Sequence, residues 1–273
     1  MTTPTPAQRY THADIDLHVA CREGYLAGVK QILDTGRADV FCRGDVGITP
    51  VMEAAWRGHR DVVEHLVSHG ADVSLVDVYG DYILHYACLS GDRKTVEFVL
   101  SLDGVDINSR GRWSKTPVML AARWGHRDVV ELLVSQGADV SLVDDDGNNI
   151  LHYACIGRDR GTVEFVLSLD GVDINSRGRW STTPVMLAAW REHRDVVELL
   201  VSQGADVSLV DDDGNNILHY ACLGGDKKTV ESVLSLDGVD INARNNYGET
   251  AADWARDRGH LQLVEFLVSR GTQ

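Results

Sequence analysis

The chain has 273 residues, of which 44% are hydrophobic and 25% are charged, as is ordinary for a folded protein. Its net charge of −15 argues against nucleic acid as a partner, because phosphate binding needs a surplus of Lys and Arg. No apolar run reaches the roughly 18 residues that span a membrane, and the first ten residues do not resemble a secretion signal. We expect a cytoplasmic or nuclear protein with no membrane insertion.

The chain opens with a polar segment and a first pair of helices. Residues 1–13 are rich in Pro and Thr, which predicts a flexible lead-in. Asp14 is the expected N-cap of a helix over residues 17–24, and a second helix is expected over residues 29–33.

From residue 49 onward the sequence repeats at a fixed interval. The motif TPVM stands at residues 49–52, 116–119 and 183–186, so successive copies lie 67 residues apart. HRDVVE and then GADVSLVD follow each copy. Each interval also holds a related unit that begins ILHYAC, so the elementary repeat has 33 or 34 residues. Such repetition predicts stacked units, since one unit alone cannot bury its apolar side.

Within one unit, the pattern predicts two helices and a hairpin. Thr116 is the expected N-cap, and Pro117 takes the first helical position, where its missing N–H costs nothing. Gly125 ends this helix, and a second helix with an apolar stripe is expected over Arg127–Ser135. Residues 139–147 alternate and then close on Asp-Gly, which is a β-hairpin signal.

Eight such units are expected within one domain over residues 14–273. The first and last deviate from the pattern, as terminal caps of a repeat array do. Their approximate bounds are residues 14–46, 47–79, 80–113, 114–146, 147–180, 181–213, 214–247 and 248–273.

No constellation of residues indicates catalysis or metal binding. Cys88, Cys155 and Cys222 occupy one repeat position, too far apart in a stack for a disulfide, so reduced thiols in a helical core are expected. The DDDGNN segments lack the spacing of a calcium loop and are better explained by turn chemistry. We expect no enzyme activity, no cofactor and no metal.

The motif TPVMLAA…GH…VVELLVSQGADV resembles the ankyrin repeat pattern TPLHLAA…GH…IVELLL..GADVN, over residues 14–271. The resemblance implies an all-α solenoid of stacked helix-turn-helix units with projecting β-hairpin loops. His85, His152 and His219 match the family's first-helix histidine, which usually hydrogen-bonds between repeats. In alternate units Tyr82 and Asn149 replace the capping Thr; Asn can still cap a helix, whereas Tyr cannot.

The resemblance also implies a function, because ankyrin arrays are protein-binding modules and almost never enzymes. Their usual contact surface combines the hairpin tips with the inner face of each first helix. Transferred unit by unit, the candidate binding residues are Asp45, Trp56, Arg57, Tyr79, Arg112, Trp113, Lys115, Arg123, Trp124, Asp145, Asp146, Arg179, Trp180, Trp190, Arg191, Asp212, Asp213 and Tyr247.

Two internal copies can be compared without any alignment of homologues. Residues 114–180 and 181–247 differ at 13 of 67 positions, and nine differences lie on or beside the expected concave surface. That surface set holds only 14 of the 67 positions, while the second-helix segment RDVVELLVSQ is unchanged. Diversification for binding explains this better than tolerated drift on an exposed surface.

Five of the six tryptophans fall in the surface set, each beside an arginine. Trp and Arg are enriched in binding hot spots, whereas exposed Trp is otherwise unfavourable for solubility. Two alternatives stay open. The guanidinium groups could stack on the rings between neighbouring units and so stabilise the array itself. The alternating acidic and basic tips could form solvated ion pairs or face an extended peptide.

The sequence therefore predicts a monomer that binds another protein or peptide on its concave face, without catalysis. The alternative is a structural spacer, or the repeat region of a larger scaffold.

Overall fold

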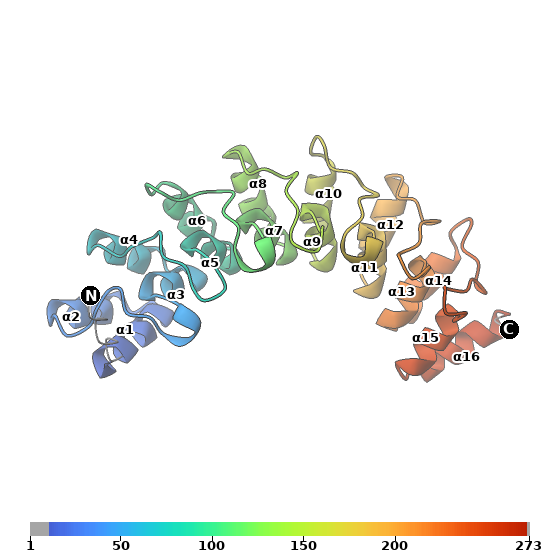
Figure 1. Cartoon of the computed structure of the whole chain (residues 1–273), viewed down its shortest axis with the longest axis horizontal. Coiled ribbons are helices and arrows are strands. Elements are labelled where there is room, and N and C mark those ends of the chain that lie inside the picture. Colours follow the sequence, from blue (N-terminus) through green and yellow to red (C-terminus); the bar gives the residue numbers. More distant parts are fainter. Residues whose placement is uncertain (1–10, 272–273) are drawn as a thin grey trace, which may run out of the picture. The chain divides into compact units, whose positions relative to one another are not determined.

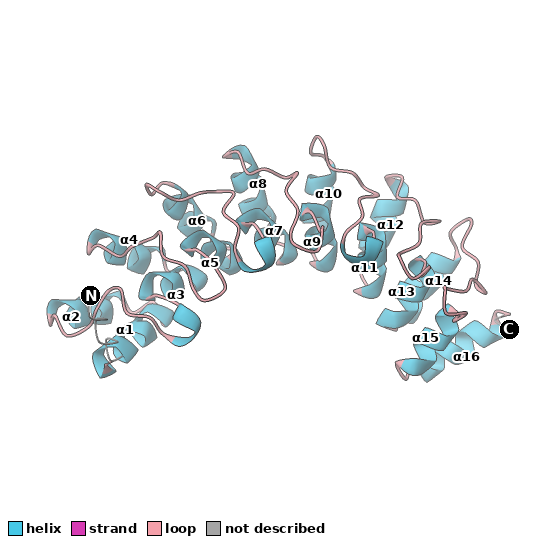
Figure 2. Cartoon of the chain, viewed as in Figure 1, coloured by secondary structure: helices cyan, strands magenta, loops and turns pink. Residues whose placement is uncertain are grey.

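The computed structural model describes residues 11–271, and within that range the chain forms sixteen α-helices and three short 3₁₀ turns (Figure 2). The helices alternate between a first and a second helix of each pair. The first helices are α1 (His12–Arg22), α3 (Pro50–Trp56), α5 (Ile83–Ser90), α7 (Pro117–Arg123), α9 (Ile150–Ile156), α11 (Pro184–Trp190), α13 (Ile217–Gly224) and α15 (Ala251–Asp257). The second helices are α2 (Leu26–Asp34), α4 (Arg60–Ser68), α6 (Arg93–Leu100), α8 (Arg127–Ser135), α10 (Arg160–Leu167), α12 (Arg194–Ser202), α14 (Lys227–Leu234) and α16 (Leu261–Ser269).

The chain divides into two compact units. The first comprises residues up to Leu120 with Ser135–Ala138, and the second comprises Ala121–Val134 with Asp139 onward, so the division runs through α7 and α8. In the first unit, α3 packs between α1 and α5, and α4 between α2 and α6 (Figure 1). In the second, α11 packs between α9 and α13, and α12 between α10 and α14. Each unit is thus two layers, one of first helices and one of second helices.

Small and branched side chains make the core of both layers. Ala121 and Ala122 on α7 are fully buried, which lets first helices approach closely. On α8, Val129, Val130 and Leu133 are fully buried and form the predicted apolar stripe. The bounds of α8 are those predicted from the repeat motif.

The helix starts follow the predicted capping scheme in part. Pro50 and Pro184 occupy the first turn of α3 and α11 as expected, and the Asn149 side chain caps α9. Tyr82 makes no side-chain cap bond; instead its N–H donates to His85 Nδ1.

Two details of the capping prediction were wrong. The hydroxyl oxygens of Thr116 and Thr183 have no hydrogen-bond partner, so at these two starts the cap bond is missing. At the N-terminus, α1 begins at His12 and its N-cap is Thr11, while Asp14 closes the capping box from the third helical position. The predicted lead-in is therefore shorter by two residues, and residues 1–10 lie outside the described range.

The predicted β-hairpins do not form as paired strands anywhere in residues 11–271, where the sole β-bridge joins Arg244 to Thr250. The tips that begin at Asp77, Asp144 and Asp211 are instead tight turns held by that aspartate. The Asp144 N–H donates to the Asn148 carbonyl at 3.0 Å, and Asp144 Oδ1 accepts from the N–H groups of Asp146 and Asn148. The side chain takes up donors that a longer ladder would have paired, so the loop closes before strands can extend.

Buried histidines link each alternate first helix to the loop of the next repeat, as the resemblance implied. The Nε2 atoms of His85, His152 and His219 lie 3.1, 3.1 and 3.2 Å from the carbonyl oxygens of Lys115, Thr182 and Glu249. All three rings are fully buried. These bonds fix the position of each tip relative to the preceding first helix.

Candidate interaction surface

None of the eighteen predicted surface residues is buried. The tryptophans are the most conspicuous, with exposed fractions of 55% for Trp113, 60% for Trp124 and 63% for Trp180. A single large apolar side chain at this exposure is normal. Several exposed tryptophans in one chain are unusual, because tryptophan is mostly buried. The exposure satisfies the first requirement of a contact surface.

In the first unit, one tip gathers four of the predicted residues. The Arg112 guanidinium lies 4.2 Å from the Tyr79 ring centre and 4.0 Å from that of Trp113. Lys115 Nζ lies 4.5 Å from the same Trp113 ring. The indole is therefore held between two cations at a preset orientation.

A second group lies at the end of α3. Arg57 lies 4.7 Å from the Trp56 ring centre and 3.8 Å from Glu53. Glu53 is almost fully buried and also accepts from Arg22 at 2.8 Å. Sequence reasoning missed this carboxylate, although it stands where the other two copies of the motif have Leu120 and Leu187.

In the second unit, the tips are joined to one another by polar contacts. Arg179 stacks on Trp180 at 4.1 Å and lies 3.6 Å from Asp146. A second contact joins Asp212, which accepts from Ser181 Oγ at 2.6 Å. A third joins Asp213, which accepts from the Tyr247 hydroxyl at 3.0 Å. These contacts make the row of tips a connected surface.

The ends of the first helices in the second unit carry the remaining residues. Arg191 lies 4.4 Å from the Trp190 ring centre. Arg123 and Trp124 end α7 at the equivalent repeat position, with the order of the two residue types reversed. These Arg–Trp stacks join sequence neighbours, whereas the stacking predicted as an alternative role would lie between neighbouring units.

The two tryptophan-bearing tips have a strained backbone. Trp113 and Ser114 both have positive φ, at 56° and 57°, as do Trp180 and Ser181, at 53° and 61°. The tips that carry Asp-Gly or Tyr-Gly place glycine at the position of the serine, as at Gly80 and Gly147. A non-glycine residue in this region costs roughly 1–2 kcal/mol. Strain is thus concentrated where the indole rings are displayed.

Replacing Ser114 and Ser181 together by Gly is expected to raise the free energy of unfolding by about 1 kcal/mol or more, because glycine adopts positive φ without a Cβ clash. Urea denaturation followed by far-UV circular dichroism measures the change. Glycine in place of Ser68 and Ser135, near the ends of α4 and α8, is the control and should not stabilise. Equal effects in both variants would mean that the tip backbone is not strained.

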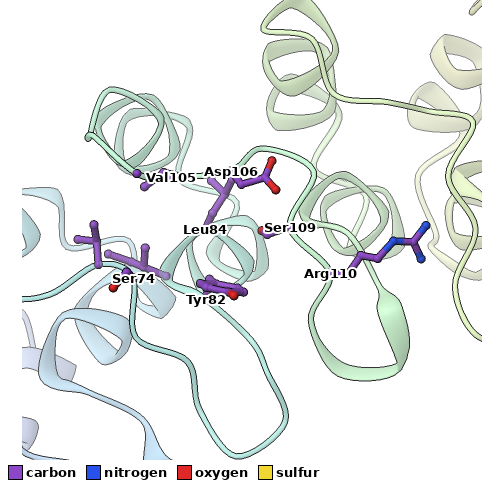
Figure 3. Close-up of a pocket in the computed structure, with 10 residues that line it drawn as sticks. Ser74, Tyr82, Leu84, Val105, Asp106, Ser109 and Arg110 are labelled. Carbon is purple, nitrogen blue, oxygen red and sulfur yellow. The ribbon is translucent and has the colours of Figure 1, made fainter.

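A pocket of about 370 Å³ lies apart from this surface, between the loops that follow α4 and α6 (Figure 3). The buried Ser109 hydroxyl at its wall has no hydrogen-bond partner. In the next copy the equivalent Ser176 accepts from Asn149 Nδ2 at 2.9 Å. Tyr82, which stands in place of that Asn, offers no amide to Ser109, so this hydroxyl lacks the bond that Ser176 makes.

The described residues hold no group of three or more His, Cys, Asp or Glu side chains that could bind a metal ion. All five cysteines are buried free thiols, and burial raises the pKa of each thiol, which keeps them protonated and unreactive. Across residues 11–271, no helix has the length and apolar character to cross a bilayer.

Comparison with known proteins identifies the family of the repeat. The family model for ankyrin repeats matches three times, over residues 17–111, 103–178 and 180–273. The chain belongs to the ankyrin-repeat family. The match identifies an ankyrin-repeat chain, and such chains are interaction modules. The three matches do not give the number of individual repeats.

Similar ankyrin regions occur in much longer proteins. The chain is 26% identical over 255 residues to palmitoyltransferase AKR1 of Lachancea kluyveri, covering 93% of this chain and 26% of that protein. It is 30% identical over 225 residues to human palmitoyltransferase ZDHHC17, covering 82% of this chain and 35% of that protein. It is 27% identical over 245 residues to the Drosophila melanogaster transient receptor potential cation channel subfamily A member 1, covering 82% of this chain and 20% of that protein. The chain thus spans about a third or less of the relatives it matches.

Proposed function

We propose that this chain is a module of eight ankyrin repeats, one for each helix pair, that binds another protein or peptide and catalyses nothing itself. The binding surface consists of the tips and the ends of the first helices. Family membership gives the interaction role, whereas the binding face and the number of repeats are proposed. A cytoplasmic or nuclear location of this chain and a monomeric state are also part of the proposal.

The observation that carries the proposal is the display of Trp113, Trp124 and Trp180. Each indole is more than half exposed, and two of the three stand on a backbone at positive φ. Hot-spot residues gain affinity when they are held in place before binding, because less conformational entropy is lost. The arginine stacks on Trp113 and Trp180 provide such ordering.

Replacing Trp113, Trp124 and Trp180 by Ala is expected to abolish capture of a partner from a native lysate, with a change in melting temperature of only a few degrees. Truncating a hot-spot Trp costs about 2 kcal/mol or more in binding. Capture is measured by pull-down with the wild-type chain and identification of the retained protein by mass spectrometry.

A matched control removes exposed apolar side chains elsewhere. Leu261 and Val268 on α16 are 64% and 55% exposed, and changing both to Ala should leave capture intact. If the tryptophan variant melts much lower and the wild-type chain captures nothing, the rings act in the array itself.

That outcome would favour a second candidate, a structural spacer within a larger protein. The connected tips of the second unit and the length of the relatives are the observations that support it.

A further inference from the structure

Most basic residues that begin the second helices are neutralised within their own helix. An arginine faces a glutamate four residues later, with nitrogen–oxygen distances between 2.6 and 2.9 Å. The pairs are Arg60–Glu64, Arg93–Glu97, Arg127–Glu131, Arg160–Glu164 and Arg194–Glu198. The outer layer therefore presents little uncompensated positive charge.

Three arginines at the ends of first helices in the second unit differ from these. Arg123 ends α7, Arg158 follows α9, and Arg191 caps α11. In the part of the chain that the structure describes, none of the three has a carboxylate within ion-pair distance. Arg158 was not among the predicted site residues, although it differs between the internal copies, where Gly225 is its equivalent.

The three charges act on the same region. Burial, and after it the charge of Arg123, lowers the pKa of Arg191. Burial also lowers the pKa of His193, and the charges of Arg158 and Arg191 both contribute in the same direction. Arg123 thus lies close enough to Arg191 to repel it, and Arg158 and Arg191 both act on His193.

Nearby acidic side chains are already engaged elsewhere. Asp144 accepts from the Tyr153 hydroxyl and from Asn148, and Asp146 lies beside Arg179. Asp159 caps α10 by accepting from Thr162. Glu192, which follows Arg191, is exposed and forms no ion pair with it within the described residues. A chain of net charge −15 therefore holds a local excess of positive charge on this face.

We propose that the first-helix face of the second unit binds an extended acidic segment of the partner, whose carboxylates pair with Arg123, Arg158 and Arg191. The exposed ring of Trp124 and the partly exposed ring of Trp190 cover apolar residues of that segment. This inference rests on the proposed interaction function and specifies the chemistry of the partner.

The spacing of the arginines suits an extended chain. Packed helices lie about 8–10 Å apart, and an extended peptide advances about 3.3 Å per residue. A carboxylate at every third residue therefore meets one arginine per helix. Planar guanidinium groups bind carboxylates through two parallel hydrogen bonds, which gives geometric selectivity as well as attraction.

The test uses a fluorescein-labelled peptide that repeats Glu-Leu-Ser four times, titrated with the full chain and followed by fluorescence anisotropy. We expect saturable binding that weakens with salt, and no binding of the matching Gln-Leu-Ser peptide. The triple variant Arg123→Gln, Arg158→Gln, Arg191→Gln is expected to bind about tenfold more weakly or worse. The single variant Arg158→Gln, which leaves the Trp190 stack intact, should weaken binding about threefold and guards against misfolding of the triple variant.

The matched control is Arg127→Gln, Arg160→Gln, Arg194→Gln, which removes the same charge from the second helices. It should change the affinity by less than about twofold, because those arginines are already paired. Equal weakening by both triple variants would overturn the proposal, as would wild-type binding of the Gln peptide. Tighter binding of a phosphoserine version or of polyuridylate than of the Glu peptide would also overturn it, as would no binding of the Glu peptide.

The proposed function can survive that failure. A lysate partner that is lost with the tryptophan variant, but kept by the inner arginine variant, would confirm an interaction module and exclude an acidic segment as its ligand.

Discussion

The free energy of unfolding is expected to fall by about 3 kcal/mol through His152 alone as the pH drops from about 6.5 to about 4. The pKa of His152 is lowered from 6.5 to about 4 in the folded chain, and each pKa unit corresponds to 1.36 kcal/mol. Between these values the unfolded state binds more protons than the folded state. The stability is therefore complete above the unfolded pKa, is lost as the pH falls, and changes no further below the folded pKa.

Burial is the main cause of this shift. The imidazole lies on α9 with no exposed surface, and its Nε2–H donates to the Thr182 carbonyl. The Nδ1 atom accepts from the Asn149 N–H and also lies 2.7 Å from Asn149 Oδ1, so the cost of a second proton comes from burying its charge. The pKa values of His85 and His219 are lowered by burial in the same direction.

Urea denaturation at pH 7, 5.5 and 4.5 measures the effect. The variant His152→Gln is expected to be less stable at pH 7 and to lose stability less steeply on acidification than wild type. The exposed His12, changed to Gln, is the control. Carboxylates with lowered pKa, such as Asp139 and Asp206, lose their contribution to the free energy of unfolding mainly below pH 4. They therefore add little to the change measured between pH 7 and 4.5. Parallel pH profiles for wild type and His152→Gln would contradict the assignment.

Repetition is the reason that much of the fold could be predicted. An apolar stripe predicts a helix more strongly when it recurs at the repeat interval. The observed bounds of α8 are therefore the same as the predicted ones. The same argument placed His85, His152 and His219 at equivalent positions, and each one bonds to the following repeat. Both predictions rest on interactions that recur along the array, the histidine bond in alternate repeats.

Features set by contacts of individual side chains, or by the backbone conformation of a tip, could not be predicted from the repeat pattern. The alternation over residues 139–147 indicated strands, but Asp144 accepts hydrogen bonds from donors that a strand ladder needs. The burial of Glu53 depends on Arg22, which lies 31 residues earlier in a different repeat. The positive φ of Ser114 and Ser181 is hidden because serine is not a residue that signals such a conformation.

The candidate surface was predicted better by position than by chemistry. The chosen residues lie at the tips and helix ends, and all are at least partly exposed. What the sequence does not show is which charges are already paired. Arg127 and Arg123 look alike in the sequence, yet the first faces Glu131 at 2.7 Å and the second has no carboxylate partner in the described residues.

A close backbone contact at the end of α9 leads to the second prediction of a large change in stability. Gly157 has φ −68° and ψ 163°, and a Cβ added there would lie 2.7 Å from the Arg123 carbonyl oxygen and 2.9 Å from that of Ala122. In the other two copies the helix runs one residue further and ends on a glycine in the left-handed region, Gly91 or Gly225. Arg158 stands at that position here, so α9 ends early and Gly157 takes up an extended conformation against α7.

Replacing Gly157 by Ala is therefore expected to lower the free energy of unfolding by about 2 kcal/mol or more, because the clash involves backbone atoms that cannot rotate away. Urea denaturation measures the loss. Gly161→Ala in α10 is the matched control: its Cβ would meet only the mobile end of Arg127 at 3.3 Å, and the other copies carry Lys94 and Lys228 there. That change should stabilise by about 0.5 kcal/mol, as Gly to Ala does within a helix. Opposite signs for two identical substitutions four residues apart would establish that packing between α7 and α9, rather than chain flexibility, requires the glycine; the same sign for both would refute it.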